Sequence, residues 1–410
     1  MSGRAPFLAL AAAETVSISG TRLSTIAIPW LVLSTTNSPV STGLVAMAEM
    51  LPYVVAKALG GPLIDRAGPK RIAILCDAAS AAVVGLVPLL HLLGMLTVPA
   101  LLPIVFVLGA LRGPADAAKQ AMVPDIAELA AVPLERVTGV VGTIERLAST
   151  VGAAGAGALI AVMTGPAQAL AFNAATFAVA ALIIGAGIPA LRHPAVAAAA
   201  SYGRDLLEGW TFLRRDAVLM GIVVMVAATN LLDQAFHAVL LPVWTRDAGH
   251  GPELLGAMLA VFSGSSMVGA AIAASIGERM PRLVVYTVAF LLTGFPRFLV
   301  LAVDVPLALV FATLAIGGFA SGFLNPILFA VMFERIPKPL VGRVTSMSTA
   351  LCWTLIPFGG LFGGALISGV GLPAALLLIG LAYLAATLLP LARRSFRGFG
   401  KRRVAGADPS

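Results

Sequence analysis

The chain has 410 residues, of which 59% are hydrophobic and 11% are charged, and its formal net charge is +8. Soluble globular domains carry about 25% charged residues, so this composition excludes an ordinary soluble enzyme or binding domain. Because a helix needs about 20 apolar residues to cross the hydrocarbon core of a bilayer, the sequence predicts a polytopic membrane protein.

Twelve apolar segments follow one another along the chain, and we expect each to form a membrane-spanning helix. The 42 glycines and many alanines are typical of helices that pack backbone to backbone in a membrane. The first segment is too long for the apolar region of a signal peptide, so we expect it to stay in the membrane. The segments cover residues 7–33, 40–60, 72–92, 98–118, 137–163, 167–189, 217–243, 253–276, 283–303, 305–333, 342–368 and 372–392.

The distribution of lysine and arginine predicts the orientation of these segments. Of the 27 Lys and Arg, four lie within predicted spans: Arg22, Lys57, Arg112 and Arg297. Arg246 lies in a connection on one side, and all the others lie in connections or termini on the opposite side. Cytoplasmic connections carry the excess of positive charge, so we expect both termini in the cytoplasm and the protein in the plasma membrane.

The longest cytoplasmic connection divides the chain into two halves. Residues 202–216 place leucines and Trp210 on one helical face and charged residues opposite, which predicts an amphipathic helix on the inner leaflet. The Gly/Ala-rich stretch 152–161 resembles 359–368, half the chain away, as duplicated transporter halves do. We predict an all-α fold with twelve transmembrane helices in two pseudo-symmetric six-helix bundles. The predicted parts are a bundle over 1–190, a linker over 191–216, a bundle over 217–392 and a basic, lipid-anchoring tail over 393–410.

A charged loop motif lies between the second and third segments. It reads Gly61-Pro-Leu-Ile-Asp65-Arg66-Ala-Gly68-Pro-Lys70-Arg71. The glycines Gly61 and Gly68 allow close backbone approach and a turn. We expect Arg66, Lys70 and Arg71 to fix the topology and to bind neighbouring carboxylates. A topological charge cluster without any gating role is the alternative interpretation.

This motif resembles the loop signature of the major facilitator superfamily, and the twelve spans, central linker and cytoplasmic termini match that family as well. The resemblance implies a transporter that works by alternating access. It also implies that Asp65 faces the start of the eleventh segment, near Gly342 and Arg343, and latches the two halves together on the cytoplasmic side. A carboxylate there would interact favourably with the positive end of a helix dipole.

Other stretches are similar to the efflux branch of that superfamily, which includes macrolide and enterobactin exporters. The resemblance implies proton-coupled export of a bulky amphipathic molecule. Arg112 resembles the membrane-embedded arginine of the fourth segment in drug antiporters, although the residues after it do not match. Ala153 and Ala154 stand where many antiporters carry Gly-Pro. The similar stretches are 14–22, 27–33, 173–177 and 205–210.

Ionisable residues within predicted spans are the candidates for proton coupling, because a charge at the bilayer centre costs about 2.5–3.5 kcal/mol on insertion scales. The antiparallel register of the first two segments places Glu14 level with Lys57 and Arg22 level with Glu49, which predicts two ion pairs. Arg112 is an alternative partner for Glu14. Breaking the Arg22–Glu49 pair in a dry cavity would favour protonation of the carboxylate. We therefore assign a structural ion-pair role to Lys57 and Arg297. The residues assigned to proton coupling are Glu14, Glu49, Asp233, Arg22 and Arg112. The alternative is that these charges form ion pairs that only fix the register of the helices.

The seventh segment carries a polar stripe. Asn230, Asp233, Gln234 and His237 follow one another at i, i+3, i+4 and i+7, so they share one face of an otherwise apolar helix. We expect this face to line a cavity, with Asp233 contacting a proton or cation or, alternatively, pairing with Arg297. Pockets for organic ligands are mostly apolar with a few fixed polar groups. The predicted substrate-cavity residues are Asn230, Gln234, Trp30, Tyr53, Phe236, Asn325 and Trp353.

The predicted function is secondary active efflux of an amphipathic organic molecule in exchange for protons. The sequence has no Walker-type nucleotide motif, catalytic triad or metal-binding motif, so we expect neither an enzyme nor a bound cofactor or metal. The two cysteines, Cys76 and Cys352, are too far apart for a ligand motif. We expect the substrate, protons and the lipid bilayer as partners, no nucleic acid, and a monomer. A proton-coupled importer of a small solute and a non-transporting membrane scaffold are the alternatives.

Overall fold

The computed structural model describes residues 4–163, 165–190, 202–276 and 280–392, and these residues form helices without strands. The basic tail predicted over 393–410 and the first part of the linker, 191–201, lie outside the described residues. The main helices are α1 (Ala5–Thr36), α2 (Pro39–Leu59), α3 (Gly61–Ala67), α4 (Pro69–Leu92), α5 (Val98–Ala121), α6 (Val123–Leu129), α7 (Leu134–Val162), α8 (Pro166–Gly187), α9 (Tyr202–Leu213), α10 (Ala217–Ala235), α11 (Leu241–Asp247), α12 (Pro252–Ile276), α13 (Arg282–Thr293), α14 (Phe295–Ala302), α15 (Leu307–Ser321), α16 (Leu324–Arg335), α17 (Val341–Trp353), α18 (Ile356–Val370) and α19 (Leu372–Ala392).

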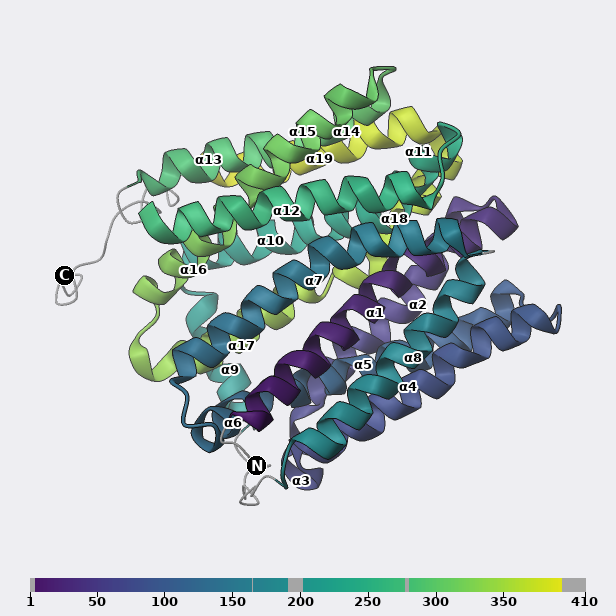
Figure 1. Cartoon of the computed structure of the whole chain (residues 1–410). Helices are drawn as coiled ribbons and strands as arrows, with labels where there is room; N and C mark the ends of the chain where they lie inside the picture. Colours follow the sequence, from purple (N-terminus) through teal and green to yellow (C-terminus); the bar gives the residue numbers. More distant parts are fainter. Residues whose placement is uncertain (1–3, 164, 191–201, 277–279, 393–410) are drawn as a thin grey trace. The chain divides into compact units, whose positions relative to one another are not determined.

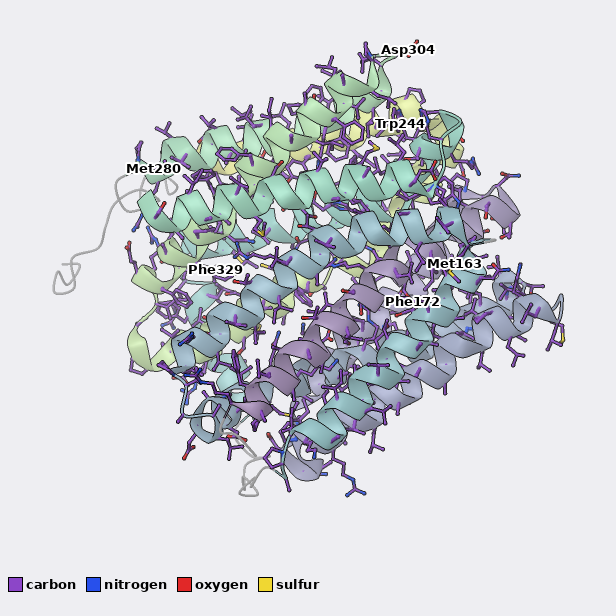
Figure 2. The ribbon with its side chains drawn as sticks, in the orientation of Figure 1. Met163, Phe172, Trp244, Met280, Asp304 and Phe329 are labelled. Atoms are coloured by element: carbon purple, nitrogen blue, oxygen red, sulfur yellow. The ribbon has the colours of Figure 1, made fainter. Side chains whose placement is uncertain are left out.

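The helices are those of a membrane protein. Within the described ranges, ten helical stretches are long and apolar enough to cross a bilayer, and some of them join consecutive helices, as Val98–Leu129 joins α5 and α6. Large apolar side chains point outward from the helices; Figure 2 labels Phe172 on α8 and Phe329 on α16, which are 53% and 48% exposed. Such surfaces suit hydrocarbon rather than water. The all-helical membrane fold is confirmed, and the count of twelve spans stays a prediction.

The chain divides into two compact units, and the first contains α1 to α8 together with residues 234–260 and 357–369. In this unit α1 packs along α7 and α8, and α4 packs against α5 and α8 (Figure 1). Part of its core is a cluster of small and branched side chains from α1, α4, α5 and α8, including Leu10, Ala73, Ala118 and Ile184. This core surrounds the buried polar groups described below.

Glycines bring α2 and α5 into backbone contact. A Cβ atom built on Gly109 would lie 2.0 Å from the carbonyl oxygen of Glu49, and one built on Gly113 would lie 2.7 Å from the carbonyl oxygen of Tyr53. Neither position can accept a side chain without moving a backbone. Small residues allow this approach in membranes, where van der Waals packing drives helix association.

The turn between α1 and α2 is determined locally. Asn37 ends α1 in the left-handed region, at φ 51°, which asparagine tolerates better than most residues. Ser38 then caps α2, since its Oγ accepts the backbone N–H of Ser41 at 3.1 Å, and Pro39 occupies the first helical position. These three residues fix where the first helix stops and the second begins.

The second unit contains α9, α13 to α17 and α19, with residues 217–233 and 261–276. Within it α14 packs on α19, where a Cβ on Gly380 would lie 2.9 Å from Phe298 Cβ, and α13 packs on α15. The linker is helical as predicted over α9, and Leu213 is buried beside Val344 of α17. The division into six-helix halves at residues 191–216, and the position of α9 on the inner leaflet, stay predictions.

Candidate functional site

Glu49 pairs with Arg112 in the first unit, and not with Arg22 as the register of the first two segments suggested. Glu49 Oε1 lies 2.5 Å from Arg112 Nη1, and the side chains are 9% and 10% exposed. The expectation was wrong because it assumed that the second segment turns its charged face to the first. The glycine contacts instead press α2 against α5, so its ionisable residues meet Arg112 and Asp116.

Tyr53 connects the charges of α2 and α5. Its hydroxyl donates to Asp116 Oδ2 at 3.1 Å and accepts from Lys57 Nζ at 3.2 Å. The Arg112 guanidinium lies 5.5 Å from the ring centroid, within cation–π distance. Lys57 thus contacts Tyr53 on its own helix, and the salt bridges given for the described residues do not include the predicted Glu14–Lys57 pair.

Arg22 lies half-buried on α1, and its aliphatic stem packs against Gly152 of α7, where a Cβ would lie 3.2 Å from Arg22 Cβ. Among the described residues, its buried Nε has no hydrogen-bond partner. The electrostatic neighbours of Arg22 include Arg112, of like charge, and the carboxylates of Glu145 and Asp116. Its predicted role in proton coupling stays a prediction.

The structure also contains a buried ion pair that sequence reasoning missed. Lys119 of α5 lies 2.9 Å from Asp77 of α4, and each side chain is 1% exposed. Lys119 also donates to Ser17 Oγ of α1 at 2.8 Å. Both charges lie within candidate spans, Val98–Leu129 and Pro69–Leu92. The signal was present in the sequence, since Asp77 interrupts the apolar run 72–92 and Lys119 directly follows the run that ends at 118.

Asp233 and Arg297 form an ion pair within the second unit, the alternative suggested by their similar depth. The Arg297 side chain is 1% exposed and that of Asp233 is 33% exposed. The Arg297 guanidinium lies 4.8 Å from the Phe298 ring centroid and 5.1 Å from that of Tyr383. The aromatic rings thus surround the cation, while the carboxylate keeps a more open face. Asn230, three residues before Asp233, donates to the Cys352 carbonyl oxygen at 2.9 Å.

A π-helix over Phe236–Leu240 interrupts the predicted polar stripe of the seventh segment. An extra residue per turn rotates the following positions, so His237 is no longer in register with the residues before it. Phe236 is 1% exposed and packs edge-on against the His237 ring at 5.3 Å. Such π-bulges are frequent at functional sites.

The remaining predicted cavity residues differ in burial. Trp30, Gln234 and Trp353 are half-buried, and Asn325 is exposed on α16. Trp30 and Gln234 belong to the first unit, and Asn325 and Trp353 to the second. Their assembly around one cavity stays a prediction.

The charged loop motif forms α3 and the start of α4. Gly68 makes the predicted turn at φ +83°, whereas a Cβ on Gly61 would meet no atom within 4 Å, so the close approach expected there does not occur. Lys70 donates to the carbonyl oxygens of Gly185 at 3.0 Å and Ile188 at 2.5 Å. It therefore caps the end of α8, where carbonyls lack helical partners, and among the described residues no carboxylate is recorded as its ion-pair partner.

The side chains proposed for the cytoplasmic latch are accessible. Asp65, Arg66 and Arg71 are exposed. In the second unit, Arg343 at the start of α17 pairs with Glu208 of α9. The predicted latch between Asp65 and residues 342–343 stays a prediction.

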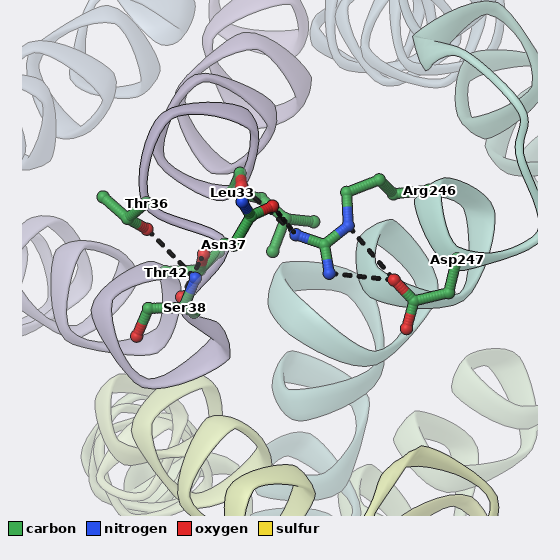
Figure 3. A network of polar contacts seen from close by, with 7 residues as sticks. All are labelled: Leu33, Thr36, Asn37, Ser38, Thr42, Arg246 and Asp247. Carbon is green, nitrogen blue, oxygen red and sulfur yellow. Dashed lines mark hydrogen bonds and ion pairs between the residues drawn. The ribbon is translucent and has the colours of Figure 1, made fainter.

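Arg246, the one basic residue predicted on the outer side, joins two distant parts of the sequence within the first unit. Figure 3 shows that its Nη1 donates to the Leu33 carbonyl oxygen, at 3.2 Å, and to Asn37 Oδ1, at 3.0 Å. Asp247 orients the guanidinium by accepting from Nε at 3.1 Å and Nη2 at 2.8 Å. Arg246 on α11 thus clasps the end of α1, and we call these contacts the outer clasp.

Small residues continue the contact around the outer clasp. A Cβ on Gly43 of α2 would lie 2.2 Å from the Gly360 carbonyl oxygen, and one on Gly364 of α18 would lie 2.3 Å from that of Pro39. A Cβ on Gly157 of α7 would lie 2.5 Å from the carbonyl oxygen of Pro252. All these residues belong to the first unit. At this end, early and late segments of the sequence are therefore closely packed.

Arg246→Ala is expected to loosen the outer clasp. Two hydrogen bonds from a partly exposed guanidinium are worth roughly 1 kcal/mol net, so the clasped population should fall about fivefold relative to the open one. Spin labels at positions 34 and 250, in a background without Cys76 and Cys352, should then report a new population at longer distance. Asp247→Asn is the control, because the amide oxygen can still accept from the guanidinium and both bonds to α1 stay in place. Identical distance distributions in Arg246→Ala and the parent would contradict the assignment.

Comparison with known proteins agrees with these features. The profile of the transmembrane secretion effector family matches residues 4–398. The multidrug efflux pump Tap of Mycobacterium tuberculosis is 32% identical over 388 residues, which cover 93% of this chain and 91% of the relative. The pump of the same name from Mycolicibacterium fortuitum is 30% identical over 391 residues, covering 93% and 94%.

Solved structures share the fold at low sequence identity. A mutant of the nucleoside transporter NupG superposes with a TM-score of 0.80 at 14% identity, covering 94% of this chain and 99% of the other. A bacterial homologue of the human lysosomal transporter Spinster gives 0.70 at 14% identity, covering 99% of each. Together with the family profile and the efflux-pump relatives, these matches show that the chain is a multi-pass transporter of the major facilitator superfamily, in its drug-efflux branch.

Proposed function

We propose that this transporter exports an amphipathic organic molecule in exchange for protons, by alternating access. It would lie in the plasma membrane as a monomer, with both termini in the cytoplasm. Relatives that carry the name of multidrug efflux pumps support the outward direction and the organic cargo. The predicted cavity residues are uncharged and combine aromatic rings with a few amides, which supports the same cargo.

The Glu49–Arg112 pair is the observation that carries the proton coupling. Both side chains are buried, and Glu49 lies in α2, a candidate span. A carboxylate buried next to a guanidinium remains ionised, and it favours protonation once the guanidinium moves away in a dry environment. A change in the packing of α2 on α5 during transport would therefore load or release one proton.

Alternating access requires contacts that close one end and can separate. The outer clasp and the glycine contacts around it fit this requirement, because they consist of hydrogen bonds from one partly exposed guanidinium and of contacts between small residues. Asp65 on the exposed α3 supplies the corresponding latch at the cytoplasmic end in this proposal. The Asp233–Arg297 pair, with its more exposed carboxylate, provides a second contact for a proton or a cation.

Reconstitution into proteoliposomes with an imposed pH gradient tests this proposal. One pH unit is worth about 1.4 kcal/mol per proton, so one-for-one exchange supports roughly tenfold accumulation of substrate. The wild-type protein should show this accumulation with a substrate found by screening lipophilic cations, macrolides and siderophores. Glu49→Gln should abolish it, because the amide cannot carry the proton.

Glu334→Gln is the matched control, since it makes the same chemical change at a carboxylate that is 35% exposed. This variant should accumulate substrate as the wild type does. Unchanged proton-driven accumulation in Glu49→Gln would refute the assignment of Glu49. An absence of any accumulation by the wild type across the screened classes, with the pH gradient verified, would refute proton-coupled efflux.

A further inference from the structure

Lys119 lies at the centre of a buried polar cluster that joins α1, α4 and α5 in the first unit. Its ammonium donates to Ser17 Oγ at 2.8 Å and lies 3.1 and 2.9 Å from the two carboxylate oxygens of Asp77. A lysine ammonium has three N–H donors, and two of them form hydrogen bonds here, with Ser17 Oγ and with Asp77 Oδ1. The Lys119–Asp77 pair is electrically balanced and almost completely enclosed.

Glu14 is a second carboxyl group beside this pair. It lies one helical turn from Ser17 on α1, on the same face, and is 9% exposed. The described residues give Glu14 no ion-pair partner within 4.0 Å. Lys119 attracts it electrostatically, and three carboxylates repel it: Asp116, Asp77 and Glu145. Helix α8, which also packs on α1, contains no ionisable residue.

The charge balance of the cluster requires a proton. Leu10, Ala13, Ala73, Cys76 and Ala118 form the apolar core around it. Two ionised carboxylates beside one ammonium would leave one negative charge in excess, and an unpaired charge in such surroundings is far more costly than a neutral carboxylic acid. The cluster therefore retains one proton, carried by Glu14 while Asp77 is paired with Lys119.

We propose that Glu14, Asp77 and Lys119 form a proton site in which Lys119 is the exchangeable counter-ion. When the Glu14 carboxylic acid releases its proton to water, the ammonium turns from Asp77 toward the new carboxylate; proton uptake reverses the movement. Lys119 keeps all three of its own protons, so one proton enters or leaves per exchange. This inference rests on the proposed proton-coupled antiport and adds a site to it.

The surroundings of the cluster permit this exchange. Lysine has a flexible four-carbon stem, and its point charge can be rotated between neighbouring acceptors. Ser17 already binds the ammonium one turn from Glu14. Ser80 lies one turn from Asp77 on α4, is 0% exposed, and its hydroxyl has no hydrogen-bond partner among the described residues. It is available to donate to Asp77 when Lys119 turns away.

Infrared difference spectroscopy of the full chain in lipid vesicles, recorded against pH, tests the site without any substrate. The wild type should show the carbonyl stretch of a buried carboxylic acid at low pH and lose it as the pH rises. Glu14→Gln, which keeps the Asp77–Lys119 pair, should lack this band. Glu334→Gln, which makes the same change at a carboxylate that is 35% exposed, is the control and should retain it.

The Asp77→Asn/Lys119→Gln double variant tests the exchangeable counter-ion. It removes both charges together, so neither is left buried without a partner, which would endanger folding. Without the ammonium, no cation can pair with the ionised Glu14 carboxylate, so Glu14 should stay protonated. The band should therefore persist through the pH range in which the wild type loses it. In proteoliposomes, this variant and Glu14→Gln should lose the roughly tenfold proton-driven accumulation per pH unit.

These measurements test the proton site and the proposed proton-coupled antiport independently of each other. A band that survives in Glu14→Gln, or that disappears at the wild-type pH in the double variant, would overturn the proton site even if wild-type accumulation is normal. The expected band behaviour in a wild-type protein that shows no proton-driven accumulation would support the site and refute the proposed antiport.

Discussion

Arg112→Gln is expected to lower the free energy of unfolding by about 3–5 kcal/mol, because it leaves the Glu49 carboxylate buried without its cation. The two side chains are 10% and 9% exposed, so water cannot replace the lost partner. The Glu49→Gln/Arg112→Gln double variant should recover most of this loss, because it leaves no orphaned charge. Thermal and denaturant unfolding of the purified protein in detergent measure both effects.

Arg282→Gln is the control for this prediction. Arg282 binds Glu334 through two hydrogen bonds, at 2.6 and 2.7 Å, but the pair is partly exposed. Exposed pairs contribute about 0–1 kcal/mol, so the loss should be several times smaller than for Arg112→Gln. If Arg112→Gln and Arg282→Gln lower the free energy of unfolding equally, burial of the Glu49–Arg112 pair does not determine its contribution to stability.

The helices could be predicted from the sequence, because the hydrocarbon core of a bilayer admits few kinds of segment. A spanning segment must be apolar and must satisfy its own backbone, so long apolar runs predict helices with little ambiguity. Ser38 and Pro39 at the start of α2 are local signals that the apolar pattern alone did not use, since the predicted segment began at residue 40. The turn at Gly68 was predictable, because glycine adopts positive φ without strain.

The partners of the buried charges could not be predicted from register alone. Depth along two antiparallel helices placed Glu49 and Arg22 at one level, but depth does not say which helix faces which. That choice depends on Gly109 and Gly113, which belong to a third helix and bring α2 onto α5. A sequence search for glycines opposite charged helix faces would have favoured Arg112 as the partner of Glu49.

The Lys119–Asp77 pair was missed for a topological reason. Lys119 directly follows the predicted end of the fourth span at residue 118, so counting basic residues assigned it to the cytoplasm. In the structure α5 continues to Ala121, and Lys119 is enclosed. An aspartate inside the preceding apolar run was the available sign that a lysine at the end of the next span was its buried partner.

The polar stripe of the seventh segment shows a different limit. Its spacing assumed a regular helix with 3.6 residues per turn, which describes α10 up to Ala235. The π-helix over Phe236–Leu240 has more residues in each turn, so His237 leaves the predicted face. No feature of sequence periodicity announces such a bulge, because it arises from packing.

Gly109→Ala is expected to destabilise the first unit, because the added methyl group meets the backbone of α2. Its Cβ would lie 2.0 Å from the Glu49 carbonyl oxygen and 3.1 Å from Pro52 Cγ, so α2 and α5 must separate. Overpacking of this kind costs about 1–3 kcal/mol or more, and the separation would also pull Glu49 from Arg112. We expect a lower unfolding temperature together with impaired proton-driven transport.

Gly155→Ala on α7 is the matched control, because a Cβ there would meet no atom within 4 Å. In a helix, alanine is favoured over glycine by about 1 kcal/mol, so this variant should be as stable as the parent or more stable. The opposite signs of the two glycine-to-alanine changes would tie stability to the α2–α5 contact rather than to helix propensity. If the two variants have the same unfolding temperature, α2 and α5 are not in close contact at Gly109. Glycine packing would then not explain why Glu49 pairs with Arg112.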